Sequence, residues 1–263
     1  MAALRLVAAL AFGPLLADTS GTGAAPFYTA ESIANSAANV TALFAPNTFV
    51  TIYGVDLANN IVAIGPDDIR GGILPTVLIG SGVRVLVNQI SANLYYVSPT
   101  QVNFLIPTLL APGPAVVQLT IDGRAGPPIT IALEATAPSL FQTDVRTILA
   151  THGNGSVATH DAPARRGEII TLWATGLGPT IPPAISNQIP QAAAPLQRSA
   201  DFRVLLNGVA APPESLRYAG VAPGFAGLFQ INFRIPDDAP SDPEIRISTG
   251  SISSPAGRFL PLQ

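Results

Sequence analysis

The chain contains no cysteine in its 263 residues. Disulfide frameworks, cysteine-ligated zinc sites and cysteine nucleophiles are therefore all excluded. A secreted protein with this composition must be held together by core packing alone. The sequence also lacks a Gly-x-Ser-x-Gly motif, which argues against a hydrolase built on a nucleophile elbow.

Charged residues are scarce as well. Asp, Glu, Lys and Arg make up 11% of the chain, against roughly 25% in typical soluble domains. The formal net charge is −3, so no basic field is present to hold nucleic acid or an anionic membrane. The chain has 48% apolar residues, 26 prolines and 23 glycines. This composition is typical of short strands joined by rigid turns and is the opposite of a disordered chain.

The N-terminus has the pattern of a secretory signal. One basic residue, Arg5, precedes an apolar run that is broken at Pro14. This run is too short to span a bilayer, which takes roughly 20 apolar residues, and every later apolar run is interrupted within about 10 residues. The sequence therefore predicts a signal peptide or disordered N-terminus over residues 1–25. It also predicts no membrane span after signal removal and a secreted or cell-surface location.

An internal repeat organises the rest of the chain. The heptad QVNFLIP at residues 101–107 returns as QINFRIP at 230–236, with five of seven positions identical. Residues 51–57 correspond to residues 171–177 in the same way. The offset between copies grows from 120 to 129 residues, and the extra residues fall in 219–228, where a loop can absorb them. A fixed-order recurrence of this kind indicates a duplicated structural unit.

Both copies show the two-residue periodicity of strands. Val83, Val85 and Val87 alternate with residues of the opposite face, as expected for antiparallel sheets with one buried face. Asp122-Gly123 and Asn207-Gly208 supply the turns between such strands. The sequence therefore predicts an all-β fold of two tandem immunoglobulin-like β-sandwich domains, produced by internal duplication.

The predicted domains span residues 26–142 and 143–263. Each has the size of an ordinary domain and is long enough to bury its own core. The segment 143–164 is rich in Gly, Ser and Thr, so we expect it to connect the domains and to be the preferred site of limited proteolysis.

Four segments carry a resemblance to a known family. They are residues 45–54 (APNTFVTIYG), 163–168 (PARRGE), 172–179 (LWATGLGP) and 218–232 (YAGVAPGFAGLFQIN). In this order and combination they resemble the C-terminal repeat domain of large secreted proteins of Acidobacteria. That family is uncharacterised and distantly similar to IPT/TIG immunoglobulin-like domains. The resemblance, which covers most of the chain from about Tyr28 onward, implies secretion, β-sandwich repeats and no assigned chemistry.

Few residues are candidates for chemistry. The two histidines, His152 and His160, lie in one segment with Asp144 and Asp161, but their spacing matches no metal signature, so we expect exposed linker residues. Asp-Asp pairs that follow prolines lack the spacing of a calcium loop, and residues 176–179 lack the Lys-Ser/Thr of a phosphate loop. The sequence therefore predicts no catalytic residues, no metal and no cofactor.

Aromatic residues offer one alternative. Exposed aromatic rings on a β-sandwich can stack on the apolar faces of sugar rings. Tyr95 and Tyr96 are adjacent, so strand alternation turns at least one of them outward, and the alternation leaves Trp173 on either face. Tyr95, Tyr96 and Trp173 are therefore the candidate ligand surface.

These observations favour a non-catalytic secreted or cell-surface module that serves in structure or adhesion. Its partner would be an unknown protein or glycan at the cell surface. The alternative is a carbohydrate-binding module that uses the exposed aromatics. The second alternative is a cryptic hydrolase, which is supported only by scattered acidic residues.

Overall fold

The computed structural model describes residues 23–41 and 43–263. Of the predicted N-terminal segment 1–25, residues 1–22 lie outside this part of the chain. Helical structure within it is confined to short 3-10 turns: η1 (Ala30–Ser32), η2 (Pro66–Asp68), η3 (Ser199–Asp201) and η4 (Pro213–Ser215). No helix in the described ranges has the length and apolarity needed to cross a membrane.

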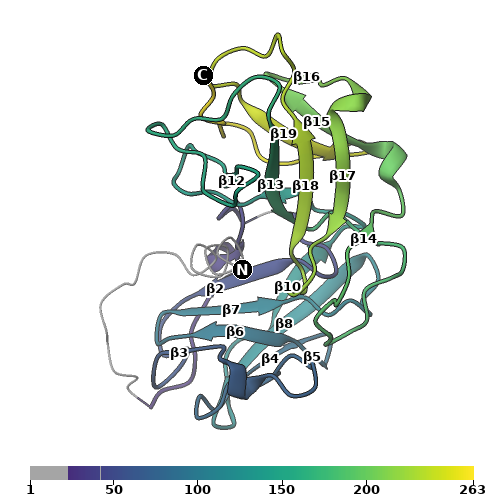
Figure 1. Ribbon diagram of the computed structural model, residues 1–263. Coiled ribbons are helices and arrows are strands. Elements are labelled where there is room, and N and C mark those ends of the chain that lie inside the picture. The colour runs from purple at the N-terminus through teal and green to yellow at the C-terminus, as the bar shows by residue number, and fades with distance from the viewer. Residues whose placement is uncertain (1–22, 42) are drawn as a thin grey trace. The chain divides into compact units, whose positions relative to one another are not determined.

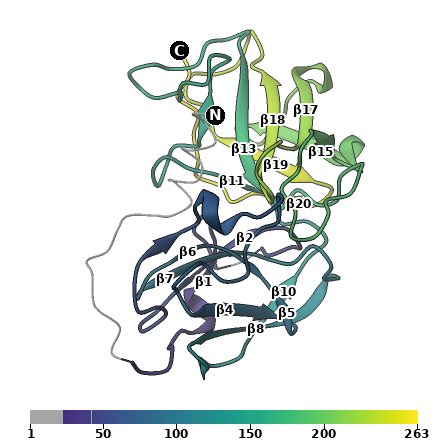
Figure 2. The same cartoon turned by 60° about the horizontal axis from the view of Figure 1, so that its bottom comes forward.

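The first sandwich consists of two antiparallel sheets (Figure 1). One sheet has the strand order β1-β2-β7-β6-β3, and the other has the order β10-β8-β4-β5, with β9 also paired to β8. Figure 2 shows the second of these sheets from another side. The strands are β1 (Ile33–Asn35), β2 (Phe49–Tyr53), β3 (Val62–Ala63), β4 (Val83–Val87), β5 (Ile90–Ser91), β6 (Asn93–Val97), β7 (Gln101–Leu105), β8 (Gly113–Ile121), β9 (Arg124–Ala125) and β10 (Ile129–Leu133).

The second sandwich repeats this order. Its sheets run β11-β13-β18-β17-β14, with β12 paired to β13, and β16-β15-β19-β20. The predicted all-β fold of two tandem immunoglobulin-like sandwiches is confirmed. The strands are β11 (Ser139–Leu140), β12 (Ala150–Thr151), β13 (Ile169–Thr175), β14 (Ala194–Pro195), β15 (Phe202–Leu206), β16 (Val209–Ala210), β17 (Leu216–Val221), β18 (Phe229–Arg234), β19 (Ile245–Thr249) and β20 (Ile252–Ser253).

The duplication extends to single irregularities of the backbone. Strand β6 shifts register against β7 between Leu94 and Tyr96, and β17 shifts against β18 between Leu216 and Tyr218. Both pairs of strands lie at the same place in their sheets, so the two copies share a β-bulge. Because a bulge is specified by local sequence and packing, a shared bulge supports descent of both sandwiches from one unit.

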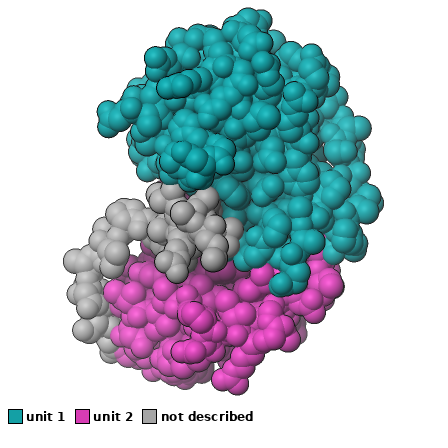
Figure 3. Space-filling model, viewed as in Figure 1, with its two compact units in different colours: residues 1–11, 136–183, 190–263 teal, residues 12–135, 184–189 magenta. Residues whose placement is uncertain are grey.

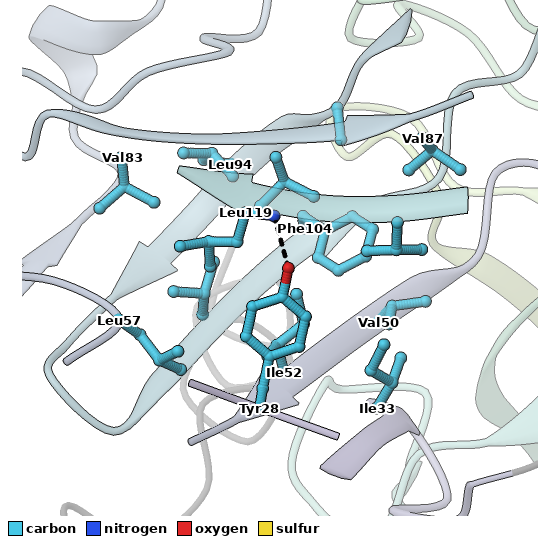
Figure 4. Close-up of a cluster of buried hydrophobic side chains, with 14 of the residues drawn as sticks. Tyr28, Ile33, Val50, Ile52, Leu57, Val83, Val87, Leu94, Phe104 and Leu119 are labelled. Carbon is cyan, nitrogen blue, oxygen red and sulfur yellow. Dashed lines mark hydrogen bonds between the residues drawn. The ribbon is translucent and has the colours of Figure 1, made fainter. Parts of the chain in front are cut away.

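Each sandwich has its own hydrophobic core. In the first, Phe104 of β7 and Leu119 of β8 lie in a cluster that is sealed by Tyr28, which is 2% exposed (Figure 4). In the second, Phe229 and Phe233 of β18 belong to a separate cluster. Complete burial of such side chains stabilises a fold by about 1.5–3 kcal/mol each, which suits a chain that has no disulfides.

The division between the units differs from the predicted one. The first sandwich ends at Ala135 and includes Ala184–Ile189, and the second comprises Thr136–Pro183 and Pro190–Gln263 (unit 2 and unit 1 of Figure 3). The segment 143–164 belongs to the second sandwich, because β12 pairs with β13 and Ala164 bridges to Leu262. The structure therefore places the predicted linker inside a domain.

The C-terminal segment completes the second sandwich. Strand β10 covers the beginning of β8 in the first sandwich, and the second sandwich has no strand β10 of its own. Instead, Ile245 donates a backbone hydrogen bond to Arg258 O at 2.8 Å, and Leu260 and Leu262 are buried. Residues 258–262 therefore take the place of β10 at the edge of β19.

Two residues in the hairpin turn after β4 have a left-handed backbone conformation, which is strained for residues other than glycine. Asn88 and Gln89 have φ angles of 47° and 64°, whereas the corresponding turn after β15 uses Asn207 and Gly208, at 50° and 81°. Because Cβ disfavours the left-handed region, Gln89→Gly should stabilise the protein by about 0.5–1 kcal/mol. The midpoint of urea unfolding, followed by far-UV circular dichroism, measures the gain. Gly208→Ala should shift the midpoint downward, and equal midpoints for both variants would contradict the argument.

Candidate functional site

A group of polar side chains lies in the second sandwich, between the end of β12 and the beginning of β13. These side chains surround an open hollow of about 790 Å³. We call it the polar hollow, and its lining is His152, Gly153, Asn154, Ser156, Asp161, Ala162, Pro163, Arg165, Arg166, Glu168 and Gln263.

A tight turn at residues 165–168 forms one wall of the polar hollow. Glu168 N donates to Arg165 O at 3.1 Å, and Gly167 adopts a φ of 77°, which glycine reaches without strain. The Glu168 carboxylate then folds back, because its Oε2 accepts the backbone N–H of Arg165 at 2.9 Å. The turn thereby fixes the position of the carboxylate at the start of β13.

His152 is held between two oxygen acceptors. Its Nδ1 lies 2.7 Å from Glu168 Oε1, and its Nε2 lies 3.1 Å from the carbonyl oxygen of Ala162. Both ring nitrogens therefore lie within hydrogen-bond distance of an oxygen atom. The side chains of His152 and Glu168 are 16% and 24% exposed, so the pair is shielded from solvent. His152 therefore acts as a clamp that joins the loop after β12 to the start of β13.

Of the other charged side chains in the polar hollow, one is held by hydrogen bonds within the protein and two are not. Arg166 is fixed, because its Nε donates to Ala239 O at 2.7 Å and a terminal nitrogen donates to Ser241 Oγ at 3.2 Å. Arg165 and Asp161 are exposed, and neither side chain has a hydrogen bond or ion pair to any described residue. The Arg165 guanidinium can therefore donate hydrogen bonds to a ligand, and the Asp161 carboxylate can accept them.

The loop after β12 also presents an ordered amide. Asn154 Oδ1 accepts hydrogen bonds from the backbone N–H and the hydroxyl of Ser156, at 2.9 and 2.7 Å. In this Asx-type turn the Asn154 NH₂ group, which is a donor, has no hydrogen bond to any described residue. The polar hollow can therefore donate and accept hydrogen bonds at neighbouring points.

Metal binding is not indicated in the described part of the chain, where no three His, Cys, Asp or Glu side chains gather closely enough to hold an ion. The Asp144 side chain instead stabilises the turn in which it lies. Backbone N–H groups of Arg146 and Thr147 donate to its Oδ1 at 2.8 and 3.0 Å. The hydrogen bond from Arg146 is the main reason why the pKa of Asp144 lies below its usual value. His160 is exposed, as predicted, whereas His152 is not a linker residue.

Two of the three predicted ligand-surface residues are buried. Tyr95 is 3% exposed and packs edge-on against Phe49, with ring centroids 4.9 Å apart, and this burial raises the pKa of its hydroxyl. Trp173 is 7% exposed. Neither ring is available for stacking, so the exposed platform predicted from Tyr95, Tyr96 and Trp173 does not form. Tyr96, on the other side of the bulge, is half-buried.

Trp173 is instead buried beside β12, outside the hydrophobic cluster of the second sandwich. Its Nε1–H donates to Thr151 Oγ1 at 3.1 Å, which satisfies the indole inside the protein. Thr151→Val keeps the shape of the side chain but leaves this donor unpaired, which should cost about 1–3 kcal/mol. Because Trp173 is the single tryptophan, its fluorescence during urea unfolding measures the effect. Ser251→Ala, at an exposed position of the turn between β19 and β20, should stay within about 0.5 kcal/mol of the parent by the same measurement.

Sequence comparison adds no family assignment: neither a family model nor a curated protein matches the chain. Three solved structures show a distant likeness to the chain. A surface glycan-binding protein of Prevotella bryantii is 14% identical, with 80% of this chain and 36% of that chain covered and a TM-score of 0.26. A Bacteroides ovatus protein of a mixed-linkage glucan utilization locus, in complex with a heptasaccharide, is 9% identical, with coverages of 92% and 47% and a TM-score of 0.34. The tandem immunoglobulin repeats of Dlar are 10% identical, with coverages of 91% and 95% and a TM-score of 0.20.

The chain thus spans less than half of the length of the first two proteins. At these identities and TM-scores the comparisons carry no inference about a ligand or an activity.

Proposed function

We propose that the chain is a non-catalytic module of the cell surface or extracellular space, in which two immunoglobulin-like sandwiches serve in adhesion or as a spacer. The observation that carries this proposal is the duplication of a whole sandwich, down to the shared bulge before Tyr96 and Tyr218. Repetition of a self-contained unit lengthens a chain and multiplies its loop surfaces without altering any one site. Such a design suits a structural role.

The use of the ionisable groups supports the same proposal. His152 has both ring nitrogens engaged, and both oxygens of Glu168 accept hydrogen bonds. Arg234 and Asp237 form an ion pair of 2.9 Å at the end of β18. A general base or nucleophile needs an open position toward its substrate, and these groups are committed to holding loops in place.

The location is inferred from the sequence. The basic residue and apolar run of residues 1–17 have the form of a secretory signal. A fold that has no cysteine to oxidise is compatible with an oxidising compartment. We further infer membership of the acidobacterial secreted repeat family from the four segments that resemble it.

Fractionation of the producing cells tests the proposal. An antibody against the chain should detect it in the medium or on intact cells, where added protease removes it. Detection only in the protected interior of the cells would overturn the surface role. The purified chain should show no turnover of chromogenic esters and glycosides above buffer. Turnover that co-purifies with the chain and is abolished by a point variant would overturn the non-catalytic part.

A further inference from the structure

Because the sandwich is duplicated, the polar hollow of the second copy can be compared with the same region of the first copy. Asn47 N donates to Ile106 O at 3.0 Å in the first sandwich, and Gly167 N donates to Ile235 O at 2.9 Å in the second. The turns that precede β2 and β13 are therefore equivalent, residue by residue. A difference between the copies at these turns cannot be a requirement of the shared fold.

The two copies of this turn differ in charge. The first reads Ala-Pro-Asn-Thr at residues 45–48, and the second reads Arg-Arg-Gly-Glu at residues 165–168. Ala45 and Thr48 are fully buried, whereas Arg165 and Arg166 are exposed. In a chain with only 11% charged residues, three adjoining charges in one copy stand out against none in the other. The fold tolerates the neutral sequence, so the charges of the second copy serve features that the first copy lacks.

The loop that faces this turn differs in the same direction. Asn35 follows Ala34, which pairs with Thr51, as His152 follows Thr151, which pairs with Thr171. The loop that follows this position has ten residues in the first copy, from Ser36 to Ala45. In the second copy it has thirteen, from Gly153 to Arg165. The Asn35 side chain closes its loop with neutral amide hydrogen bonds. The longer loop of the second copy adds the polar groups of the hollow.

The arrangement of these groups defines the chemistry of a ligand. The Arg165 fork and the Asn154 amide donate hydrogen bonds, and the Asp161 carboxylate accepts them. Two arginines and two carboxylates line the hollow, so their formal charges cancel and the field does not select an anion. A hydroxyl group both donates and accepts, and a ring that carries several neighbouring hydroxyls matches such a surface. The volume of about 790 Å³ lies within the 300–1,000 Å³ of typical ligand sites.

From this geometry we infer that the polar hollow binds a neutral saccharide. The Arg165 guanidinium and the Asp161 carboxylate contact the sugar hydroxyls, and the His152–Glu168 pair holds the loop that carries them. This inference rests on the proposed function and deepens it, because it names the class of partner that a surface module would contact. It places the contact on the loops of the second sandwich and does not use the buried rings of Tyr95 and Trp173.

Affinity electrophoresis of the purified chain in gels that contain neutral polysaccharides (β-glucan, xylan, mannan) or acidic ones (pectin, alginate) tests the site. We expect retardation by at least one neutral polymer. Arg165→Ala and Asp161→Ala should each lower the affinity at least tenfold, which corresponds to about 1.4 kcal/mol. Alanine is the native residue at the position equivalent to Arg165 in the first sandwich, so the first variant is compatible with the fold.

Matched controls are Arg217→Ala and Asp238→Ala, which remove exposed charges elsewhere on the second sandwich. Both should be retarded like the parent, and the Trp173 fluorescence should show that all four variants are folded. No retardation by any neutral polymer would overturn the saccharide site. Retardation that survives both hollow variants, or that occurs only with acidic polymers and disappears in salt, would also overturn it. Each of these results leaves the cell-surface location, tested by fractionation, unaffected.

Discussion

Replacement of Tyr28 by alanine is expected to destabilise the first sandwich by about 3–5 kcal/mol, the usual cost of removing a large buried ring. Tyr28 lies before the first strand and closes the core from the side of β8 (Figure 4). Its hydroxyl accepts the backbone N–H of Leu119 at 2.8 Å. That amide faces a gap, because β10 pairs with β8 as far as Val117 and β9 begins its pairing at Thr120.

The hydroxyl and the ring can be separated by a milder change. Tyr28→Phe keeps the ring but leaves the Leu119 N–H unsatisfied inside the protein, which should cost about 1–3 kcal/mol. Urea unfolding followed by far-UV circular dichroism gives both losses, and the exchange rate of the Leu119 amide should rise in Tyr28→Phe. Tyr53→Phe removes a solvent-exposed hydrogen bond to Asn39 and should change stability by less than about 0.5 kcal/mol. Equal losses for the two phenylalanine variants would contradict the role of Tyr28.

The surroundings explain why no larger residue follows β9 at this place. A Cβ atom on Gly126 would lie 2.6 Å from a ring carbon of Tyr28 and 2.9 Å from Pro26 O. Gly126 N also donates to Leu119 O at 2.9 Å. Glycine at this position therefore lets the ring approach the strand closely enough for its hydroxyl to reach Leu119.

The fold was predictable from sequence because its signal is distributed over many residues. Alternation in β4 and β15 and the repeated heptad each point to strands, and the order of the repeat points to duplication. The domain boundary was not predictable to the same degree. It depends on β11 and β12, each of two residues, and strands this short leave no periodicity to detect. Residues 143–164 therefore read as a linker although they are part of the second sandwich.

The aromatic prediction failed at the bulge of β6. Strict alternation would place Tyr95 and Leu94 on opposite faces, with one of them toward solvent. Leu94 lies in the hydrophobic cluster of the first sandwich. Tyr95, the extra residue of the bulge, is buried outside that cluster, against Phe49, and Tyr96 is partly exposed. At the equivalent bulge residue of β17, the second sandwich carries Arg217, which is exposed. The bulge residue is thus buried in one copy and exposed in the other, and the local sequence pattern does not reveal the bulge.

The alternation of β7 failed for a different reason. Gln101 and Asn103 fall on the polar phase of the strand, yet all five residues of β7 are buried. The amide of Gln101 donates to Asn103 Oδ1 at 2.9 Å, so polar side chains of this strand satisfy one another. Paired amides of this kind can be buried at little cost, and a period-2 pattern cannot distinguish them from a wet face.

The sequence did not predict the polar hollow, because the two residues at its centre do not form a recognisable sequence motif. His152 and Glu168 are sixteen residues apart and meet only through the pairing of β12 with β13. The repeat nevertheless contained a signal. When Ala45–Thr48 is aligned with Arg165–Glu168, charges in the second copy replace neutral residues in the first. Differences between duplicated units, rather than their similarities, indicate where a new site has been built.

A double-mutant cycle on His152 and Glu168 should give a coupling energy of about 1.5–3 kcal/mol, the range of hydrogen bonds to charged groups in shielded positions. The single variants His152→Ala and Glu168→Ala and the double variant are compared by urea unfolding, with Trp173 fluorescence as the probe of the second sandwich. Each single variant leaves one partner without its hydrogen bond, so each should be destabilised nearly as much as the double variant.

A second ion pair of the same sandwich is the control. Arg198 and Asp201 approach to 2.6 Å, which is closer than His152 and Glu168 at 2.7 Å, but their side chains are 71% and 39% exposed. Water and salt screen an exposed pair, so its coupling should be only about 0.2–1 kcal/mol. If the two cycles gave equal couplings, burial would not be the cause of the His152–Glu168 stabilisation. If the partly buried pair couples more strongly, the loop that carries Asn154 and Asp161 is held in place before any ligand binds. Binding at the polar hollow then does not include the entropy cost of ordering this loop.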